Sequence, residues 1–142
     1  MSEAGPCFLD TCIPLYAAGA DHPYRQPCLE ILAATEDARL AAVTNTEVVQ
    51  EIVHRLNSIG RQSQAIALAS DFIDIVETIL PVTRVTVVHF LEMQEAYPDL
   101  PSRDALHLAT MIESGVKLIV TADKHFDAVR EVRRIDPLDF RW

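Results

Sequence analysis

The sequence contains little glycine and none of the glycine motifs that bind phosphate groups. Its 142 residues include four glycines, and these are too widely spaced to form a nucleotide-binding loop. The segment GxSxG, which presents the nucleophile in many serine hydrolases, is also absent. These absences argue against a glycine-loop nucleotide site and against serine hydrolase chemistry.

Cysteine is scarce too, and Cys7, Cys12 and Cys28 form no CxxC pair. Such a set predicts neither a disulfide framework nor a cysteine zinc site, and it favours a reduced, cytoplasmic location. No apolar run approaches the roughly 18 residues that span a bilayer. The N-terminal residues MSEAGPCFLD lack the basic start of a secretion signal. We expect a cytoplasmic protein without a membrane partner.

Positive charge is in deficit, since the formal net charge is −9. That balance argues against a broad electrostatic attachment to nucleic acid. It does not exclude a nuclease, because acids that surround divalent cations count toward the total. Basic residues gather near the C-terminus, where a phosphate path and a solvated face are both open interpretations. They are Lys124, Arg130, Arg133, Arg134 and Arg141.

Apolar residues are plentiful: 49% of the chain is hydrophobic and 23% is charged, as in folded globular proteins. The length suits a single domain, residues 1–142. Short apolar runs alternate with helical patterns along the whole chain. This alternation predicts an α/β fold with three α/β/α layers and a short, mostly parallel central sheet. Strands are predicted at 7–9 (central), 40–43, within 74–81, 117–121 and 132–135 (edge), and helices at 14–20, 26–34, 47–56, 62–72, 85–96 and from Ser102 to Gly115.

Acids stand where these predicted elements begin or end. Asp10 follows the first strand, Asp123 follows the strand at 117–121, and Asp104 lies in the first turn of a helix that Ser102 is expected to cap. The carboxyl ends of parallel strands form the ligand crevice of an open α/β sheet. We therefore expect Asp10, Asp104 and Asp123 to meet there. The alternative is structural, because acids also form turns and stabilise helix N-termini by about 0.3–1 kcal/mol.

Two further acids share one face of the helix at 47–56. Glu47 and Glu51 are four residues apart, and Glu51 lies nearer the apolar edge, which makes it the better site candidate. Its structural alternative is an exposed ion pair with Arg55, and that of Glu47 is a first-turn acid. Asp127, one turn beyond Asp123, and His125 between them are weaker candidates.

Acids gathered in one crevice repel one another unless a cation neutralises them. Carboxylate oxygens without histidine or cysteine ligands select Mg²⁺, for which Mn²⁺ can substitute, over Zn²⁺. Such a site activates water and stabilises an in-line phosphoryl displacement. The expected reaction is hydrolysis of a phosphodiester without a covalent protein intermediate.

Segments in the order FLDTCIPLYAAG, TNTEVVQEIVHRL, SRDALHLATMIESGVKLIVTADKHFD and VRRIDP resemble PIN-domain ribonucleases, most closely the VapC-type toxins of toxin–antitoxin pairs. The resemblance covers the domain from end to end. It implies an α/β/α fold and a Mg²⁺-dependent endoribonuclease that leaves 5′-phosphate and 3′-hydroxyl ends. It also implies a toxin homodimer that a small antitoxin inhibits.

Carried over by position, the resemblance implies four catalytic acids. Asp10, Asp104 and Asp123 match the acids expected to hold the metal. Glu51 matches the helix acid better than Glu47 does, and we expect it to orient or deprotonate the attacking water or to bind a second metal. Thr121 matches a small residue that supports a carboxylate or a water. Cys12 departs from the asparagine of many members, with no expected effect on the chemistry.

Other classes of protein fit less well. A haloacid-dehalogenase-type phosphatase needs a second aspartate at position 12, which is Cys12 here, and a response-regulator receiver needs adjacent acids early in the chain. A catalytically silent PIN-like domain that binds RNA or protein is the non-enzymatic alternative.

Overall fold

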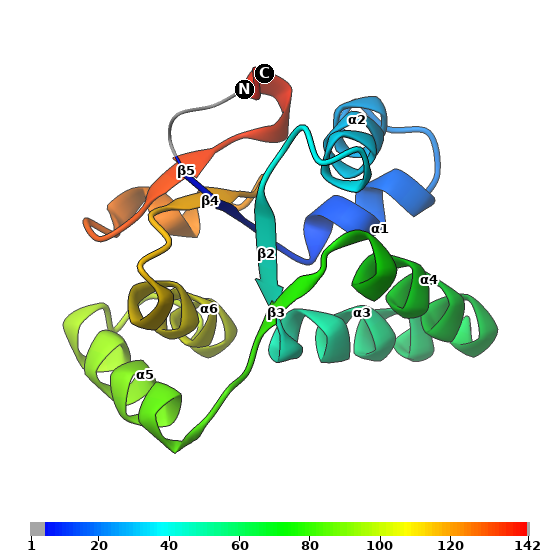
Figure 1. The fold of residues 1–142 in the computed structure, drawn as a ribbon. Coiled ribbons are helices and arrows are strands. Elements are labelled where there is room, and N and C mark those ends of the chain that lie inside the picture. Colours follow the sequence, from blue (N-terminus) through cyan, green and yellow to red (C-terminus); the bar gives the residue numbers. More distant parts are fainter. Residues whose placement is uncertain (1–4, 142) are drawn as a thin grey trace.

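The computed structural model describes residues 5–141, and the outer residues of the single domain predicted at 1–142 lie outside that range. Its centre is a parallel sheet of five strands in the order β3-β2-β1-β4-β5 (Figure 1). The strands are β1 (Cys7–Leu9), β2 (Ala42–Asn45), β3 (Thr78–Leu80), β4 (Leu118–Val120) and β5 (Arg133–Ile135). The predicted parallel α/β/α architecture is confirmed, with the first strand in the centre and the last at an edge.

Helices cover both faces of the sheet. In Figure 1, α1 to α4 lie to the right of the sheet, and α5 and α6 lie to its lower left. The helices are α1 (Cys12–Ala18), α2 (Arg25–Glu36), α3 (Thr46–Ser58), α4 (Gln62–Ile75), α5 (Arg84–Ala96) and α6 (Ser102–Ser114), with 3-10 turns η1 (Lys124–Ala128) and η2 (Pro137–Asp139). Within residues 5–141, no helix combines the length and the hydropathy needed to cross a bilayer.

The central strands form the core. All three residues of β1 and of β4 are buried, as expected for a parallel sheet covered on both faces. Phe8 and Ile119 pair in register at the centre of the sheet and are fully buried. The rigid middle of the sheet therefore holds the residues that follow β1 and β4.

The chain changes direction across the sheet between β1 and β4. From β1 it proceeds to β2 and β3, and it then crosses back to β4 and β5 on the other side of β1. Ligands of open α/β sheets bind at such a switch point, outside the carboxyl ends of the strands. Asp10 follows β1 and Asp123 follows β4 at this point.

Several predicted boundaries needed correction. The second strand is Ala42–Asn45 rather than 40–43, and the first helix starts at Cys12 rather than at residue 14. Ser102 is not an N-cap: it is the first helical residue, and Pro101 precedes it without a side-chain cap. The Pro101 ring, with φ fixed near the observed −55°, gives the chain its entry into α6. Gly115 ends that helix, as predicted, and its φ of +71° lies in the left-handed region.

Candidate functional site

A cavity of about 240 Å³ opens at the switch point, beside the ends of β1 and β4. Asp10, Glu51, Asp104 and Asp123 all line it, although they come from four separate segments. The cavity brings together the four acids that were expected to meet. The other lining residues are Thr11, Cys12, Tyr16, Arg55, Thr121 and Ala122.

Asp10 is held by hydrogen bonds to both carboxylate oxygens. The Thr11 backbone N–H donates to Oδ1 at 2.7 Å, and the Thr121 hydroxyl donates to Oδ2 at 2.8 Å. Thr121 in turn accepts a hydrogen bond of 3.0 Å from the backbone N–H of Asp123. One hydroxyl therefore links the acid that follows β1 to the turn that follows β4.

Cys12 lies closer to this network than expected. Its sulfur lies 3.5 Å from the Thr121 hydroxyl oxygen. Burial and the Asp10 carboxylate raise the pKa of the Cys12 thiol to about 12. The thiol is therefore protonated at neutral pH, and it contributes no thiolate to the cavity.

Glu51 is buried and surrounded by donors. Its Oε1 accepts a hydrogen bond of 2.7 Å from the Thr11 hydroxyl, and its Oε2 lies 3.3 Å from Arg55 and 3.4 Å from Arg103. Burial favours the neutral acid, but His107, Thr11 and Arg103 outweigh it and lower the pKa of Glu51 to about 2. Glu51 is therefore a stable anion that accepts a proton poorly at neutral pH.

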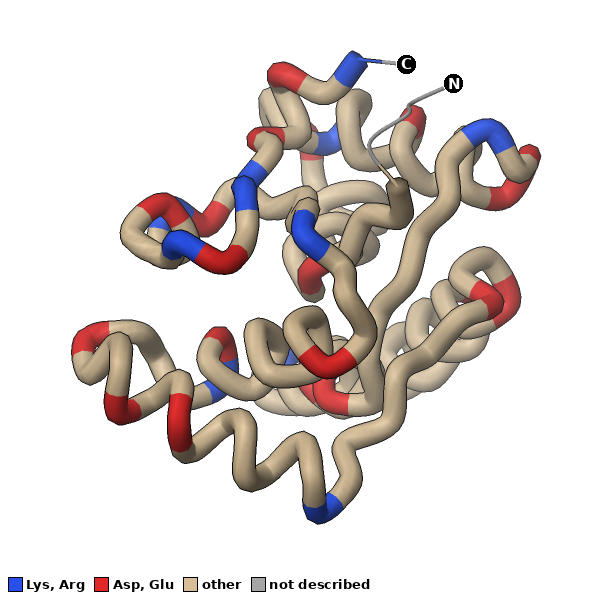
Figure 2. Tube along the Cα trace, turned by 60° about the vertical axis from the view of Figure 1, so that its left-hand side comes forward, with Lys and Arg blue, Asp and Glu red and all other residues tan. Residues whose placement is uncertain are grey.

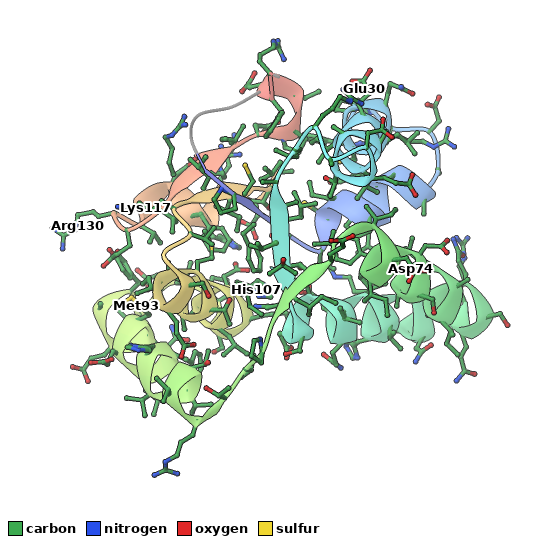
Figure 3. All side chains as sticks on the ribbon, in the orientation of Figure 1. Glu30, Asp74, Met93, His107, Lys117 and Arg130 are labelled. Atoms are coloured by element: carbon green, nitrogen blue, oxygen red, sulfur yellow. The ribbon has the colours of Figure 1, made fainter. Side chains whose placement is uncertain are left out.

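The ring of His107 is fully buried on the inner side of α6 (Figure 3), close to the carboxylates of Asp10 and Glu51. Its Nε2 is 3.7 Å from an oxygen of each carboxylate, and it has no hydrogen-bond partner among the described residues. Its Nδ1 lies 3.0 Å from the Asn45 amide nitrogen. Burial lowers the pKa of His107, whereas Glu51, Asp10 and Asp104 raise it more strongly.

Asn45 determines which nitrogen of His107 carries hydrogen. The Asn45 oxygen accepts from the Val48 backbone N–H at 2.8 Å, so its amide nitrogen must face the ring and Thr110. Nδ1 must therefore accept, and the hydrogen lies on Nε2, directed toward the two carboxylates. A second proton on Nδ1 would oppose the amide donor, so the contact with Asn45 works against the charge that the nearby carboxylates favour on the ring.

The outer acids form a second group with His125. Its Nδ1 lies 3.1 Å from Asp104 Oδ2 and 2.8 Å from Asp123 Oδ1. Burial, Asp10 and Asp123 raise the pKa of Asp104 to about 6, although His125 partly offsets this. Asp104 also raises the pKa of the exposed His125 imidazole, which favours its charged form.

The donor set fits a hard divalent cation. Ligand atoms of Asp104, Asp123 and His125 lie within 4.8 Å of one another, and so do those of Asp10, Glu51 and His107, although the His107 nitrogen that faces the acids carries hydrogen and is not free to bind a metal. The raised pKa of Asp104 reports a repulsion between carboxylates that a bound cation would relieve. Four carboxylates and no histidine are found among the residues that line the cavity, which suits Mg²⁺ or Mn²⁺.

Glu47 and Asp127 do not line the cavity. Glu47 lies 3.9 Å from Arg103, and the exposed Asp127 pairs with Arg134 at 2.7 Å. Arg134 also pairs with Asp136. Figure 2 shows basic and acidic residues alternating along the C-terminal part of the chain. The solvated-face interpretation suits this segment better than a phosphate path.

Sequence reasoning missed four neighbours of the acids: Thr11, Asn45, Arg103 and His107. His107 lies three residues after Asp104, a spacing that matches no metal-binding motif, and the sequence around Asn45 is typical of a helix N-cap. One signal was available, because a histidine within an apolar helix needs a buried partner. His125 was a weak candidate, yet it contacts both outer acids.

The fold and the site together define an α/β/α protein with an acidic pocket at the switch point of its sheet. A family model described as "PIN domain" matches residues 7–132. The chain belongs to the PIN domain family.

Named relatives are similar to most of the chain. The VapC ribonuclease Mb1869c of Mycobacterium bovis is 34% identical over 128 residues, which cover 89% of this chain and 97% of the relative. Ribonuclease VapC7 of Mycobacterium tuberculosis is 35% identical over 130 residues, covering 91% and 90%.

Solved structures share the fold at lower identity. VapC20 of Mycobacterium tuberculosis, described as a sarcin-ricin loop cleaving toxin, matches with a TM-score of 0.73 at 20% identity, covering 89% of this chain and 98% of that chain. VapBC2 of Rickettsia felis, bound to a promoter DNA fragment, matches with a TM-score of 0.72 at 15% identity, covering 93% and 98%.

Proposed function

We propose that this protein is a metal-dependent endoribonuclease and the toxin of a toxin–antitoxin pair. The observation that carries the proposal is the convergence of Asp10, Glu51, Asp104 and Asp123 on one cavity at the switch point. The family, and relatives named as ribonucleases, favour RNA as the substrate.

Within this proposal, Asp10, Asp104 and Asp123 hold Mg²⁺ or Mn²⁺. When bound, the cation supplies an activated water and neutralises charge on the phosphate. Thr121 keeps Asp10 oriented through its hydrogen bond of 2.8 Å. Metal binding requires Asp104 to be ionised, and a pKa of about 6 leaves its carboxyl mostly ionised at neutral pH and protonated in more acidic solution.

Glu51 takes part without acting as the proton acceptor. Of the roles expected for it, deprotonating the water is the one that a pKa of about 2 disfavours. Glu47 and Asp127 stay outside the proposed site, because neither lines the cavity.

The proposed partners are a small antitoxin and a second copy of the chain, in the cytoplasm. Two structural neighbours favour an antitoxin partner here: a toxin–antitoxin complex from Klebsiella pneumoniae, and VapBC-5 of Mycobacterium tuberculosis, a member of a family of toxin–antitoxin systems. We propose that residues 1–142 act as one domain in these assemblies.

A cleavage assay on mixed cellular RNA tests the proposal, with Mg²⁺, Mn²⁺ or EDTA and with Asp104→Asn beside the wild type. We expect cleavage that needs the metal, leaves 5′-phosphate ends and is lost in the variant. Equal cleavage by both proteins would indicate a contaminating nuclease. If the wild type is inactive on all RNA after any co-purified inhibitor is removed, a binding role would replace the nuclease.

A further inference from the structure

Arg55 is the only lysine or arginine among the residues that line the acidic cavity. It lies one helical turn after Glu51 on α3, and its side chain is 58% exposed. Within the described part of the chain, Glu51 is the only hydrogen-bond or ion-pair partner of its guanidinium, through Nη2 at 3.3 Å. A guanidinium has five N–H donors, so most of them remain available to a ligand in the cavity.

The surroundings of Glu51 are unfavourable for a metal ion. Its carboxylate accepts one hydrogen bond, from the Thr11 hydroxyl at 2.7 Å, and three nitrogen groups lie within 3.7 Å of it. The Thr11 hydroxyl and the His107 N–H face Oε1, and Arg55 and Arg103 face Oε2. A metal ion bound to this carboxylate would lie beside the guanidinium groups of Arg55 and Arg103, whose positive charge opposes it.

Arg103 differs from Arg55 in its surroundings. It does not line the cavity, and it is shared between Glu51 at 3.4 Å and Glu47 at 3.9 Å. Its charge is therefore balanced by neighbouring acids, and its contact holds Glu51 in place. Arg55 remains as the cation that faces the cavity.

We propose that Arg55 binds the phosphodiester of the RNA substrate, and that Glu51 is a positioning residue that holds Arg55 at the cavity wall rather than a metal ligand. This rests on the proposed ribonuclease function. A substrate anion that enters a cavity lined by four acids, in a chain of net charge −9, needs a fixed positive group beside the metal. The planar guanidinium suits a phosphate because it can donate two parallel hydrogen bonds.

The first test measures RNA binding in the Asp104→Asn background, where the RNA should stay intact. The probe is a fluorescent single-stranded RNA of mixed sequence, titrated at several salt concentrations. Arg55→Ala should weaken binding about tenfold or more and reduce the slope of log K against log salt by about 0.7, the value for one phosphate contact on a single strand. Arg55→Lys should keep the salt slope but bind RNA less tightly, because an ammonium group cannot donate the two parallel hydrogen bonds of a guanidinium. The matched control is Arg61→Ala, which removes an exposed arginine outside the cavity and should leave both quantities unchanged.

The second test separates positioning from metal binding by the rise in melting temperature on adding Mg²⁺, with Asp104 intact. Asp10→Asn should lose this rise. Glu51→Gln and Arg55→Ala should keep it, while both raise KM for RNA more than they lower kcat. The double variant Glu51→Gln/Arg55→Ala should be little worse than Arg55→Ala alone, because Glu51 acts through Arg55.

The outcomes distinguish this inference from the nuclease proposal. The role of Arg55 would be overturned if Arg55→Ala left the RNA affinity and the salt slope unchanged. The positioning role of Glu51 would be overturned if Glu51→Gln lost the Mg²⁺-induced rise in melting temperature. Either result would leave the nuclease proposal intact. A wild-type protein that neither cleaves nor binds RNA would overturn both.

Discussion

Asp104 shows how its neighbours set the behaviour of a single residue. Its pKa is raised from 3.8 to about 6 by burial and by Asp10 and Asp123. A carboxyl whose folded pKa exceeds the unfolded value stabilises the fold when protonated. That contribution is fully present below the unfolded pKa and is lost as the pH rises through the folded pKa.

We therefore predict that, in EDTA, the free energy of unfolding falls as the pH rises from 4.5 to 7, by about 2 kcal/mol from Asp104. Urea denaturation at several pH values measures this. Asp104→Asn should flatten the profile in that window. Glu51 has the opposite effect on the free energy of unfolding, because its pKa is lowered from 4.5 to about 2. That effect falls mainly below pH 4.5 and so outside the range of the experiment. A profile equally steep in the variant would show that another group is responsible.

His107 gives a second prediction at this scale. Asn45→Asp keeps the helix cap but places an acceptor opposite Nδ1, so the hydrogen should move to that nitrogen or the ring should become doubly protonated. Nitrogen NMR of the imidazole distinguishes these forms from the Nε2–H form expected in the wild type. The control is Asn57→Asp, which adds the same charge at an exposed site on α3, the helix that Asn45 caps, and should leave the His107 signals unchanged. An unaltered His107 spectrum in Asn45→Asp would show that Asn45 does not set the tautomer.

At the scale of elements, the ends of two short strands position the acids of the site. β1 and β4 have three residues each, and the chain turns into the cavity directly after both. α6 contributes Asp104 from its first turn, and Gly115 at its end directs the chain into β4. The turn at Gly115 therefore connects the helix that carries one acid to the strand that precedes another.

Gly115→Ala should destabilise the fold by about 1 kcal/mol, because φ at this position is +71° and the Cβ of alanine makes that left-handed conformation unfavourable. An added Cβ would meet nothing within 4 Å, so no clash adds to this figure. Urea denaturation measures the change. Gly115→Asn should cost less, since asparagine tolerates that conformation better. Ser114→Ala, at the exposed last residue of the helix, is the control, and an equal loss there would contradict the backbone explanation.

At the scale of the whole molecule, the cavity links metal binding to stability. A ligand that binds only the folded state stabilises it by about 2.7 kcal/mol at a hundred times its Kd. The acids come from segments that are distant in the sequence, so the unfolded chain does not hold them together.

Mg²⁺ at millimolar concentration should accordingly raise the melting temperature of the wild type. Asp10→Asn should lose this rise, and Asp127→Asn should keep it because Asp127 lies outside the cavity. Differential scanning calorimetry with Mg²⁺ and with EDTA provides the comparison. No rise in the wild type would count against a preformed metal site.

The sequence by itself predicted the α/β/α fold, the central first strand and four acids at element ends. These features follow from local patterns: apolar runs bounded by polar residues, helical periodicity, and acids placed where a run stops. Boundaries were less secure, as Ser102 shows, because Pro101 replaced the side-chain cap that local reasoning expected.

Only the tertiary structure decided which groups surround each acid. Thr11 and Glu51 are 40 residues apart and Asn45 and His107 are 62 apart, yet each pair is hydrogen-bonded in the interior. No local pattern predicts such pairs, because they depend on how α3 and α6 pack around the sheet and on which way each side chain then points. For the same reason, packing alone placed Arg55 on the wall of the cavity while it left Asp127 outside.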